Sequence, residues 1–290
     1  MTSPGIVFTD LKATTRQENL KNTLSPDIPD FVQSSVGTSF QFKQSNRVFF
    51  PMEDASEFSS FFIVEQNHMG SASHEVSSEN FKFGSNSHKA YVFKANEVIE
   101  GQDTNHRAYP TFQSHKVGFP NGIGPYVLMD YWAYVDIDIF DIPNANWFSL
   151  ATYTSYIDDI WFPSLLLNLD INYGLHLQHH KGNNIPFPSD GNARFVFPRK
   201  TWTRITQLLC YGDNYFFGGP YTIVWIDKDE KIRTDFHNRI DPISLEVDNN
   251  LIYTPNFGQA HWGMYCAPLL SSGVVYNDNI SITQMELISK

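Results

Sequence analysis

The sequence is poor in cysteine and in charged residues. Only two of its 290 residues are cysteines, Cys210 and Cys266, and charged side chains make up 18% of the chain. Two cysteines are too few for a disulfide framework, and without a CxxC pair they do not indicate a zinc site. The sequence leaves open whether the two form a single bridge.

Basic residues are in the minority, with 20 Lys and Arg against 31 Asp and Glu and a net charge of −11. A nucleic-acid partner is excluded on this ground, because neutralising phosphates needs a basic surface. No run reaches the roughly 18 apolar residues of a membrane span, so we expect no membrane partner. The first residues, Met1 to Phe8, lack the features of a secretory signal. The localisation stays open: secreted if a signal has been removed, otherwise cytoplasmic.

The sequence does contain many aromatic residues, including 24 Phe and 14 Tyr, within a hydrophobic content of 41%. They occur in short runs that alternate apolar and polar residues, as in residues 90–94, 126–139, 174–178 and 221–226. Alternation with period 2 is typical of half-buried strands. We therefore predict an all-β fold, a two-sheet antiparallel jelly-roll sandwich of the concanavalin A-like kind. Residues 46–290 form the predicted sandwich, and the polar residues 1–45 form an N-terminal arm or edge segment.

The densest group of polar residues lies in the predicted strand 105–113. Arg107, Tyr109, Thr111 and Gln113 share one face of such a strand, while His106 faces the other way. Pro110 has no ladder N–H, so it predicts an edge or a bulge. A row of Arg, Tyr, Thr and Gln is poor core material and favours an open sheet face that binds a polar ligand.

Two further strands repeat this pattern. In residues 174–180, His176 and Gln178 face away from Leu175 and Leu177, and in residues 258–268 His261 and Tyr265 share one face. The clustered histidines after residue 175 also suggest a metal site. No carboxylate accompanies them at a ligand spacing, which argues against metal catalysis.

Carboxylates are clustered at two other places. Residues 136–141, with Asp at 136, 138 and 141, resemble the ExDxxE strand of laminarinase-like glycoside hydrolases, although both Glu positions are Asp. Asp278, within Tyr276-Asn-Asp-Asn279, offers hard oxygen ligands of the kind that Ca²⁺ prefers, or else caps a turn. A structural Ca²⁺ at Asp278 is the only cofactor we expect, and no motif indicates an organic cofactor.

Several segments resemble concanavalin A-like/laminin-G-like sandwich proteins of the bacterial polysaccharide-lyase type. They are residues 87–90, 105–113, 147–152, 196–198 with Trp202, 259–265 and 272–278, within roughly residues 55–288. The resemblance implies a jelly-roll fold and a glycan-directed role. The RxExR and QIH signatures of alginate lyases on this fold do not occur in the sequence.

Our first functional hypothesis is a polysaccharide lyase that cleaves a uronate-containing glycan by β-elimination. Such an enzyme needs a group to neutralise the carboxylate, a base and an acid. Arg107 and Gln113 are predicted to hold the carboxylate, Tyr109 or His176 to act as base, and Tyr109 or Tyr265 as acid. Further contacts to the glycan are expected from Lys89, His106, Gln178 and His261.

Two alternatives stay open, because this scaffold supports many functions. One is a non-catalytic, lectin-like protein that binds a polysaccharide or oligosaccharide on the same face. The other is a sandwich used for another small-molecule reaction.

Overall fold

The computed structural model describes most of the chain as strands. The residues that it describes are 28–36, 41–57, 62–67, 71–95, 105–139, 147–157, 160–180, 186–187, 194–211, 221–235, 256–268 and 270–289. Within them, no helix is long and apolar enough to cross a membrane.

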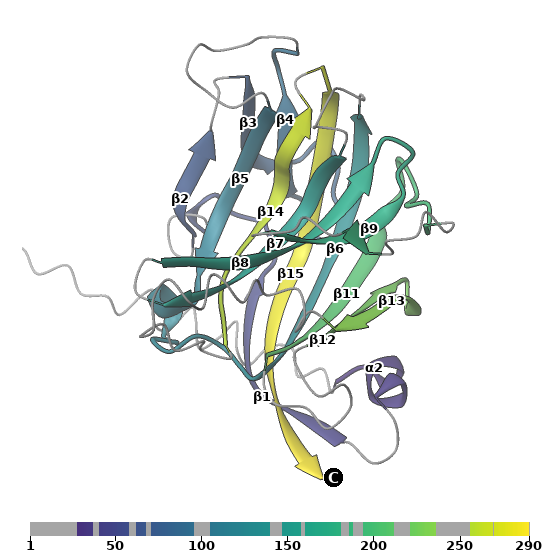
Figure 1. Ribbon diagram of the computed structural model, residues 1–290. Helices are drawn as coiled ribbons and strands as arrows, with labels where there is room; N and C mark the ends of the chain where they lie inside the picture. The colour runs from purple at the N-terminus through teal and green to yellow at the C-terminus, as the bar shows by residue number, and fades with distance from the viewer. Residues whose placement is uncertain are drawn as a thin grey trace, which may run out of the picture.

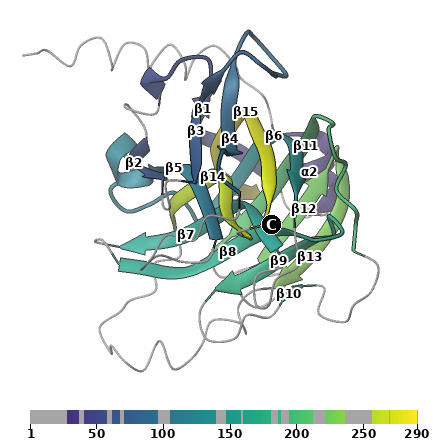
Figure 2. The ribbon, with the colours of Figure 1, turned by 90° about the horizontal axis from the view of Figure 1, so that it is seen from above.

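The strands form two antiparallel sheets, seen as two layers in Figures 1 and 2. Sheet A has the order β13-β12-β11-β6-β15-β4-β3, and β1 also pairs with β15. Its strands are, in chain order, β1 (Gln41–Phe50), β3 (Ala72–Ser77), β4 (Ser87–Val92), β6 (Tyr126–Asp138), β11 (Thr203–Cys210), β12 (Tyr221–Ile226), β13 (Asp229–Asp235) and β15 (Ser272–Ser289).

Sheet B has the order β10-β9-β8-β7-β14-β5-β2. Its strands are β2 (Phe62–Asn67), β5 (Asn105–Gln113), β7 (Trp147–Ile157), β8 (Ile160–Asp170), β9 (Leu175–His180), β10 (Pro186–Phe187) and β14 (Phe257–Pro268). A short 3-10 turn, η1 (Ser114–Val117), follows β5.

The main core lies between the sheets and follows the alternation of the strands. In β6 the odd-numbered residues from Val127 to Ile137 are buried, whereas most even-numbered ones are half-buried. On sheet B, residues such as Phe112, Leu167 and Trp262 point into the same core. Each sheet thus packs one face into the main core.

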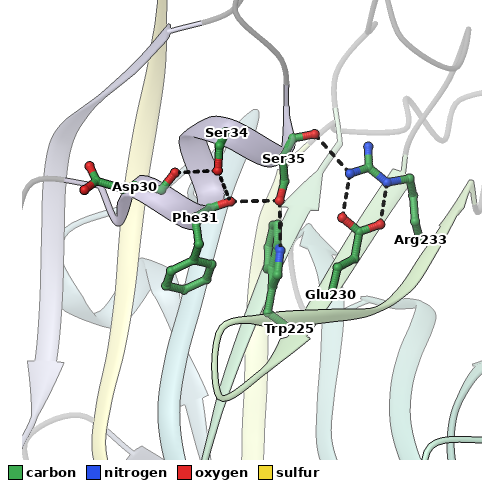
Figure 3. Close-up of polar contacts among 7 residues, drawn as sticks. All are labelled: Asp30, Phe31, Ser34, Ser35, Trp225, Glu230 and Arg233. Carbon is green, nitrogen blue, oxygen red and sulfur yellow. Dashed lines mark hydrogen bonds and ion pairs between the residues drawn. The ribbon is translucent and has the colours of Figure 1, made fainter.

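A second, smaller core covers part of the outer face of sheet A. It is formed where helix α2 (Asp30–Ser35) packs over β11 and β12, with Val32 fully buried near Leu208 and Trp225. Figure 3 shows the polar contacts there: Trp225 Nε1 donates to Ser35 Oγ at 3.1 Å, and Arg233 donates to the Ser35 carbonyl at 3.0 Å. Glu230 accepts two further hydrogen bonds from Arg233 at 2.7 Å, one from Nε and one from Nη2, and Nη2 is also the nitrogen that donates to Ser35. The helix is therefore tied to β12 and β13 by its last residue.

The predicted all-β sandwich is confirmed, and the alternating runs named above lie in strands β4, β6, β9 and β12. Residues 41–45, at the end of the predicted N-terminal segment, belong to β1, and residues 1–27 lie outside the described residues. Cys210 is buried in the smaller core.

Candidate functional site

The outer face of sheet B is lined by polar side chains. It carries the residues of β5, β14, β7, β8 and β9 that point away from the main core. Those at most 6% exposed are Tyr109, Thr111, Ser149, Thr152, Thr154, Asn168, His176, Gln178, Gln259 and His261. We call this surface the polar face. Burying a polar side chain costs folding free energy unless the side chain finds a hydrogen-bond partner, so ten such residues on one face are unusual for a face with a purely structural role.

The strand register arranges these side chains in rows across the sheet. One row begins Thr111–His261–Thr152, from β5 through β14 to β7. A neighbouring row runs Tyr265–Ser149–Asn168–His176, from β14 to β9. From β5 to β9 there are four interstrand intervals, or about 19 Å. The polar face is thus wide enough for several sugar rings.

Four of the predicted site residues form a cluster on β5 and β14. The rings of Tyr109 and His261 stack with centroids 4.0 Å apart and planes inclined by 22°. The Tyr265 ring lies 5.6 Å from Tyr109 and 5.1 Å from His261, and Arg107 Cζ lies 5.2 Å from the Tyr265 centroid. Arg107 and Tyr265 are half-buried, whereas Tyr109 and His261 are buried. Arg107 and Tyr265 are therefore the more exposed members of the cluster.

A bulge in β14 places Tyr265 in this cluster. The register with both neighbouring strands shifts between residues 262 and 267, and Gly263 there has φ +112°. A Cβ on Gly263 would lie 2.7 Å from the Ala108 carbonyl oxygen and 2.9 Å from Cε1 of His88 in sheet A. Only glycine fits a positive φ in such a close space, so the bulge depends on this residue.

Burial sets the charge state of the two histidines on this face. Loss of solvation, with a smaller contribution from the Arg107 charge, lowers the pKa of His261 to about 3. Loss of solvation also lowers the pKa of His176 to about 4. Both rings are therefore neutral at neutral pH, and Arg107 supplies the positive charge of the cluster.

Next to the cluster, several buried polar atoms have no hydrogen-bond partner. They are Oε1 and Nε2 of Gln259, Oγ1 of Thr111 and Nε2 of His261. Gln259 and Thr111 are each 1% exposed. Sequence reasoning did not select Gln259 as a site residue, although it lies two residues before His261 and so shares its face.

The structure does not bring all the predicted site residues together. His176 and Gln178 lie on the polar face but on β9, four strands from Arg107 in β5. Gln178 accepts a hydrogen bond from Asn168 at 2.9 Å, and His176 Nδ1 lies 3.1 Å from the Gly174 carbonyl oxygen. The predicted pairing of Arg107 with His176 at one reacting centre is therefore corrected: both are on one face, but too far apart to touch one substrate atom.

Lys89 and His106 are not on the polar face. Lys89 lies on β4 in sheet A, where it forms ion pairs with Glu79 and Glu75 at 2.7 and 3.5 Å. His106 is fully buried on the core side of β5, with Nδ1 2.8 Å from Ser71 Oγ. Gln113, by contrast, lies on the polar face, opposite Gln259. Neither Lys89 nor His106 lies on the polar face, and the expectation that they contact the glycan stays a prediction.

The predicted carboxylate sites lie on sheet A. Asp278 Oδ2 accepts hydrogen bonds from the backbone N–H groups of Lys82 and Phe83 at 2.8 and 2.9 Å, so this carboxylate anchors the β3–β4 loop. In the described part of the chain no three His, Cys, Asp or Glu side chains group to hold a metal. The Ca²⁺ site stays a prediction. Asp136 and Asp138 form ion pairs with Arg199, and Asp141 lies outside the described residues.

The two antiparallel sheets form a jelly-roll sandwich, and polar side chains line the outer side of sheet B. The solved structure of the cellulose-induced protein Cip1 is similar, with a TM-score of 0.52 and 11% identity over 81% of this chain and 96% of that one. An alginate lyase from a Chlorella virus has a TM-score of 0.48 and 11% identity over 79% and 95% of the two chains. A carbohydrate esterase from the bacteriophage phi24B has a TM-score of 0.46 and 10% identity over 84% and 99%.

No protein-family model matches the sequence. No curated protein matches it significantly either. At about 11% identity the similarity to Cip1 shows the fold alone, so the function has to be argued from the polar face.

Proposed function

We propose that the protein is a polysaccharide lyase that cleaves a uronate-containing glycan at the cluster of Arg107, Tyr109, His261 and Tyr265. The observation that carries this proposal is the position of the half-buried Tyr265 between the Arg107 guanidinium and the stacked Tyr109–His261 pair. A cation beside a phenol is the minimum that β-elimination requires.

Each group has a role in the proposed reaction. Arg107 binds the uronate carboxylate and stabilises the negative charge that develops when C5 loses its proton. Tyr265 reacts as its phenolate and takes that proton, becoming a neutral phenol; the electron pair of the C5–H bond forms the C4=C5 double bond, and the C4–O4 bond breaks. Tyr265 then returns the proton to the leaving oxygen. His261, neutral and with an unpaired Nε2, is a hydrogen-bonding partner for the sugar and a poor base.

A second candidate function is glycan binding without cleavage. The observation that favours it is the set of unpaired, buried polar atoms on Gln259, Thr111 and His261, because a ligand that hydrogen-bonds to them would satisfy them without any chemistry. The low pKa of His261, which makes its ring a weak base at neutral pH, is also consistent with a binding protein.

The deciding experiment is to follow the ultraviolet absorbance of the new double bond while the protein is incubated with a panel of uronate polysaccharides. We expect absorbance to rise with at least one glycan and to be lost in Tyr265→Phe. Tyr91→Phe, on the outer face of sheet A, is the matched control and should keep full activity. If the parent protein and Tyr265→Phe both bind a glycan and neither forms a double bond, the result refutes the lyase proposal and supports the lectin-like function.

A further inference from the structure

A band of aromatic side chains crosses the outer face of sheet A, on the other sheet from the polar face. Trp132 and Tyr134 point outward from β6, because their odd-numbered neighbours face the main core. The ring centroid of Tyr134 lies 5.8 Å from that of Tyr276 in β15 and 5.8 Å from that of Trp202, next to β11. The Trp132 centroid lies 5.7 Å from that of Phe83 in the β3–β4 loop. We call these five residues the aromatic band.

The aromatic band is open to solvent. Phe83 is 42% exposed, and Trp132, Tyr134 and Trp202 are half-buried, whereas Tyr276 is buried. Four of the five rings therefore present surface that a ligand can touch. Aromatic surface that is exposed in one continuous group is a common feature of binding sites, since it adds little to folding.

Hydrogen bonds hold the exposed part of the band in place. The backbone N–H groups of Lys82 and Phe83 donate to Asp278 Oδ2, which fixes the β3–β4 loop to β15. Trp202 Nε1 donates to Asn80 Oδ1 of the same loop at 3.0 Å. A surface that is already ordered loses little conformational entropy when a ligand binds, so these contacts prepare the band for binding.

Charged pairs border the band at both ends of its width along β6. On one side Asp130 accepts two hydrogen bonds from Arg204, at 2.8 and 2.6 Å. On the other side Asp136 lies 3.5 Å from Arg199 and 3.3 Å from Lys200. The two outward-facing residues of β6 between these pairs are about 6.5–7 Å apart along the strand. The band is thus a narrow aromatic surface with hydrogen-bonding groups along both edges.

A carbohydrate chain matches this arrangement. The face of a sugar ring carries C–H groups, which pack on an aromatic ring, and its hydroxyl groups lie around the edge. Those hydroxyls can donate to carboxylates and accept from guanidinium N–H groups, such as the ones that border the band. A protein partner would need a broader surface, since a stable interface buries about 800 Å² on each side. Because the bordering charges are paired with one another, the sugars need carry no charge.

We propose that the aromatic band is a second carbohydrate-binding site, which holds a glycan chain across β15, β6 and the start of β11 with its sugar faces on the rings. The band and the Tyr265 cluster lie on different sheets, so the band binds a glycan whether or not that cluster cleaves one. In a protein that acts on a polysaccharide, such a site keeps the molecule attached to the polymer between reactions.

Electrophoresis through gels that contain a soluble polysaccharide tests the site. The probes are a glucan, a mannan, a xylan, polygalacturonate and alginate, each at several concentrations, so that the retardation gives a dissociation constant. We expect at least one probe to retard the parent protein. Phe83→Ala and Tyr134→Ala should each raise the dissociation constant for that probe by about tenfold or more.

Phe93→Ala is the matched control. Phe93 is 50% exposed at the end of β4, where its ring lies beside Tyr91 and outside the band. This variant removes an equally exposed phenyl ring and should leave the dissociation constant within about twofold of the parent. Thermal unfolding checks that each variant is folded. If Tyr134→Ala fails to fold, Phe83→Ala, at an exposed position, still tests the site.

The outcomes separate this site from the proposed lyase. Weaker binding in the band variants, with no double bond formed by the parent protein, supports the site and refutes the lyase. Double-bond formation with binding unchanged in both band variants supports the lyase and overturns the site. Failure of every probe to retard the parent also overturns it. A parent protein that sediments as a dimer, and as a monomer after Phe83→Ala, would assign the band to a contact between two copies instead.

Discussion

Tyr109 and His261 stack ring on ring across the β5–β14 pair, with 4.0 Å between the ring centroids, and Tyr265 stands at the edge of both rings. Tyr109 and Tyr265 differ in exposure because Tyr109 is covered by the stack and Tyr265 lies outside it. Tyr109 is 4% exposed beneath the surface, whereas Tyr265 is half-buried beside Arg107. Of the two tyrosines that the sequence offers as acid or base, Tyr265 is therefore the one that reaches a ligand.

This difference predicts unequal effects of removing each hydroxyl. Tyr265→Phe should reduce the rate of double-bond formation by about 10²–10⁴-fold, the usual contribution of an acid–base group. Tyr109→Phe keeps the ring that stacks on His261 and should leave the rate within about tenfold of the parent, by the same scale. Rates of absorbance increase at saturating glycan compare the two. Equal losses in both variants would show that Tyr109 takes part in proton transfer.

The bulge at Gly263 predicts that a side chain there destabilises the fold by steric collision. A second glycine with a positive φ, Gly118, separates this collision from the cost of the backbone conformation. Gly118 also has a positive φ, +92°, but a Cβ there meets nothing within 4 Å. Both Gly→Ala variants incur the cost of left-handed backbone, about 1–2 kcal/mol. Gly263→Ala should lose roughly 1–3 kcal/mol more, because its methyl group collides with Ala108 and His88.

Urea unfolding of the two glycine variants measures this difference. Gly263→Ala should also lose activity, since the collision displaces the bulge that positions Tyr265. Equal destabilisation of the two variants would mean that the bulge accommodates a side chain.

The link between α2 and β12 predicts different effects for two adjacent serines. Ser35 Oγ accepts the Trp225 indole N–H, whereas Ser34 Oγ bonds only to the carbonyls of Asp30 and Phe31 within the helix (Figure 3). Ser35→Ala leaves a buried indole N–H without an acceptor and should cost about 1–3 kcal/mol. Ser34→Ala should be nearly neutral, because alanine favours the helix. Thermal unfolding compares them, and a larger loss for Ser34→Ala would be inconsistent with this role for Ser35.

The low histidine pKa values predict acid destabilisation. Burial holds the pKa of His261 at about 3 and that of His176 at about 4, against about 6.5 in the unfolded chain. The unfolded state therefore binds more protons below about pH 6.5, so the free energy of unfolding falls as the pH drops from 7 toward 4. Each histidine contributes about 1.4 kcal/mol per pH unit in the steepest part.

The histidine contribution can be isolated by substitution. His261→Gln should reduce the number of protons taken up on unfolding at pH 5 by about one, as measured from the slope of stability against pH. An unchanged slope would contradict the neutral, buried state of His261.

The sequence predicts the sandwich well, because the period-2 pattern is a local property of each strand. The run 126–139, for example, alternates in the sequence and becomes β6 with the same faces. It also predicts that Arg107, Tyr109 and Gln113 share a face, and that His261 and Tyr265 share one. What it cannot give is the order of strands in a sheet. Lys89 and His176 fit a polar site by type, but β4 belongs to the other sheet and β9 lies four strands away. Gln259 is recognised only through its lack of a partner, which is a property of the folded protein.

The position of β15 in sheet A has a consequence for how the chain folds. β15 pairs with β1, β4 and β6, and Ser45 Oγ donates to the Gln284 carbonyl across 239 positions of sequence. During synthesis, β6 and β1 therefore emerge long before their shared partner and present unpaired edges until it arrives. Such non-local pairing is slow to form, so we expect β15 to join sheet A late in folding.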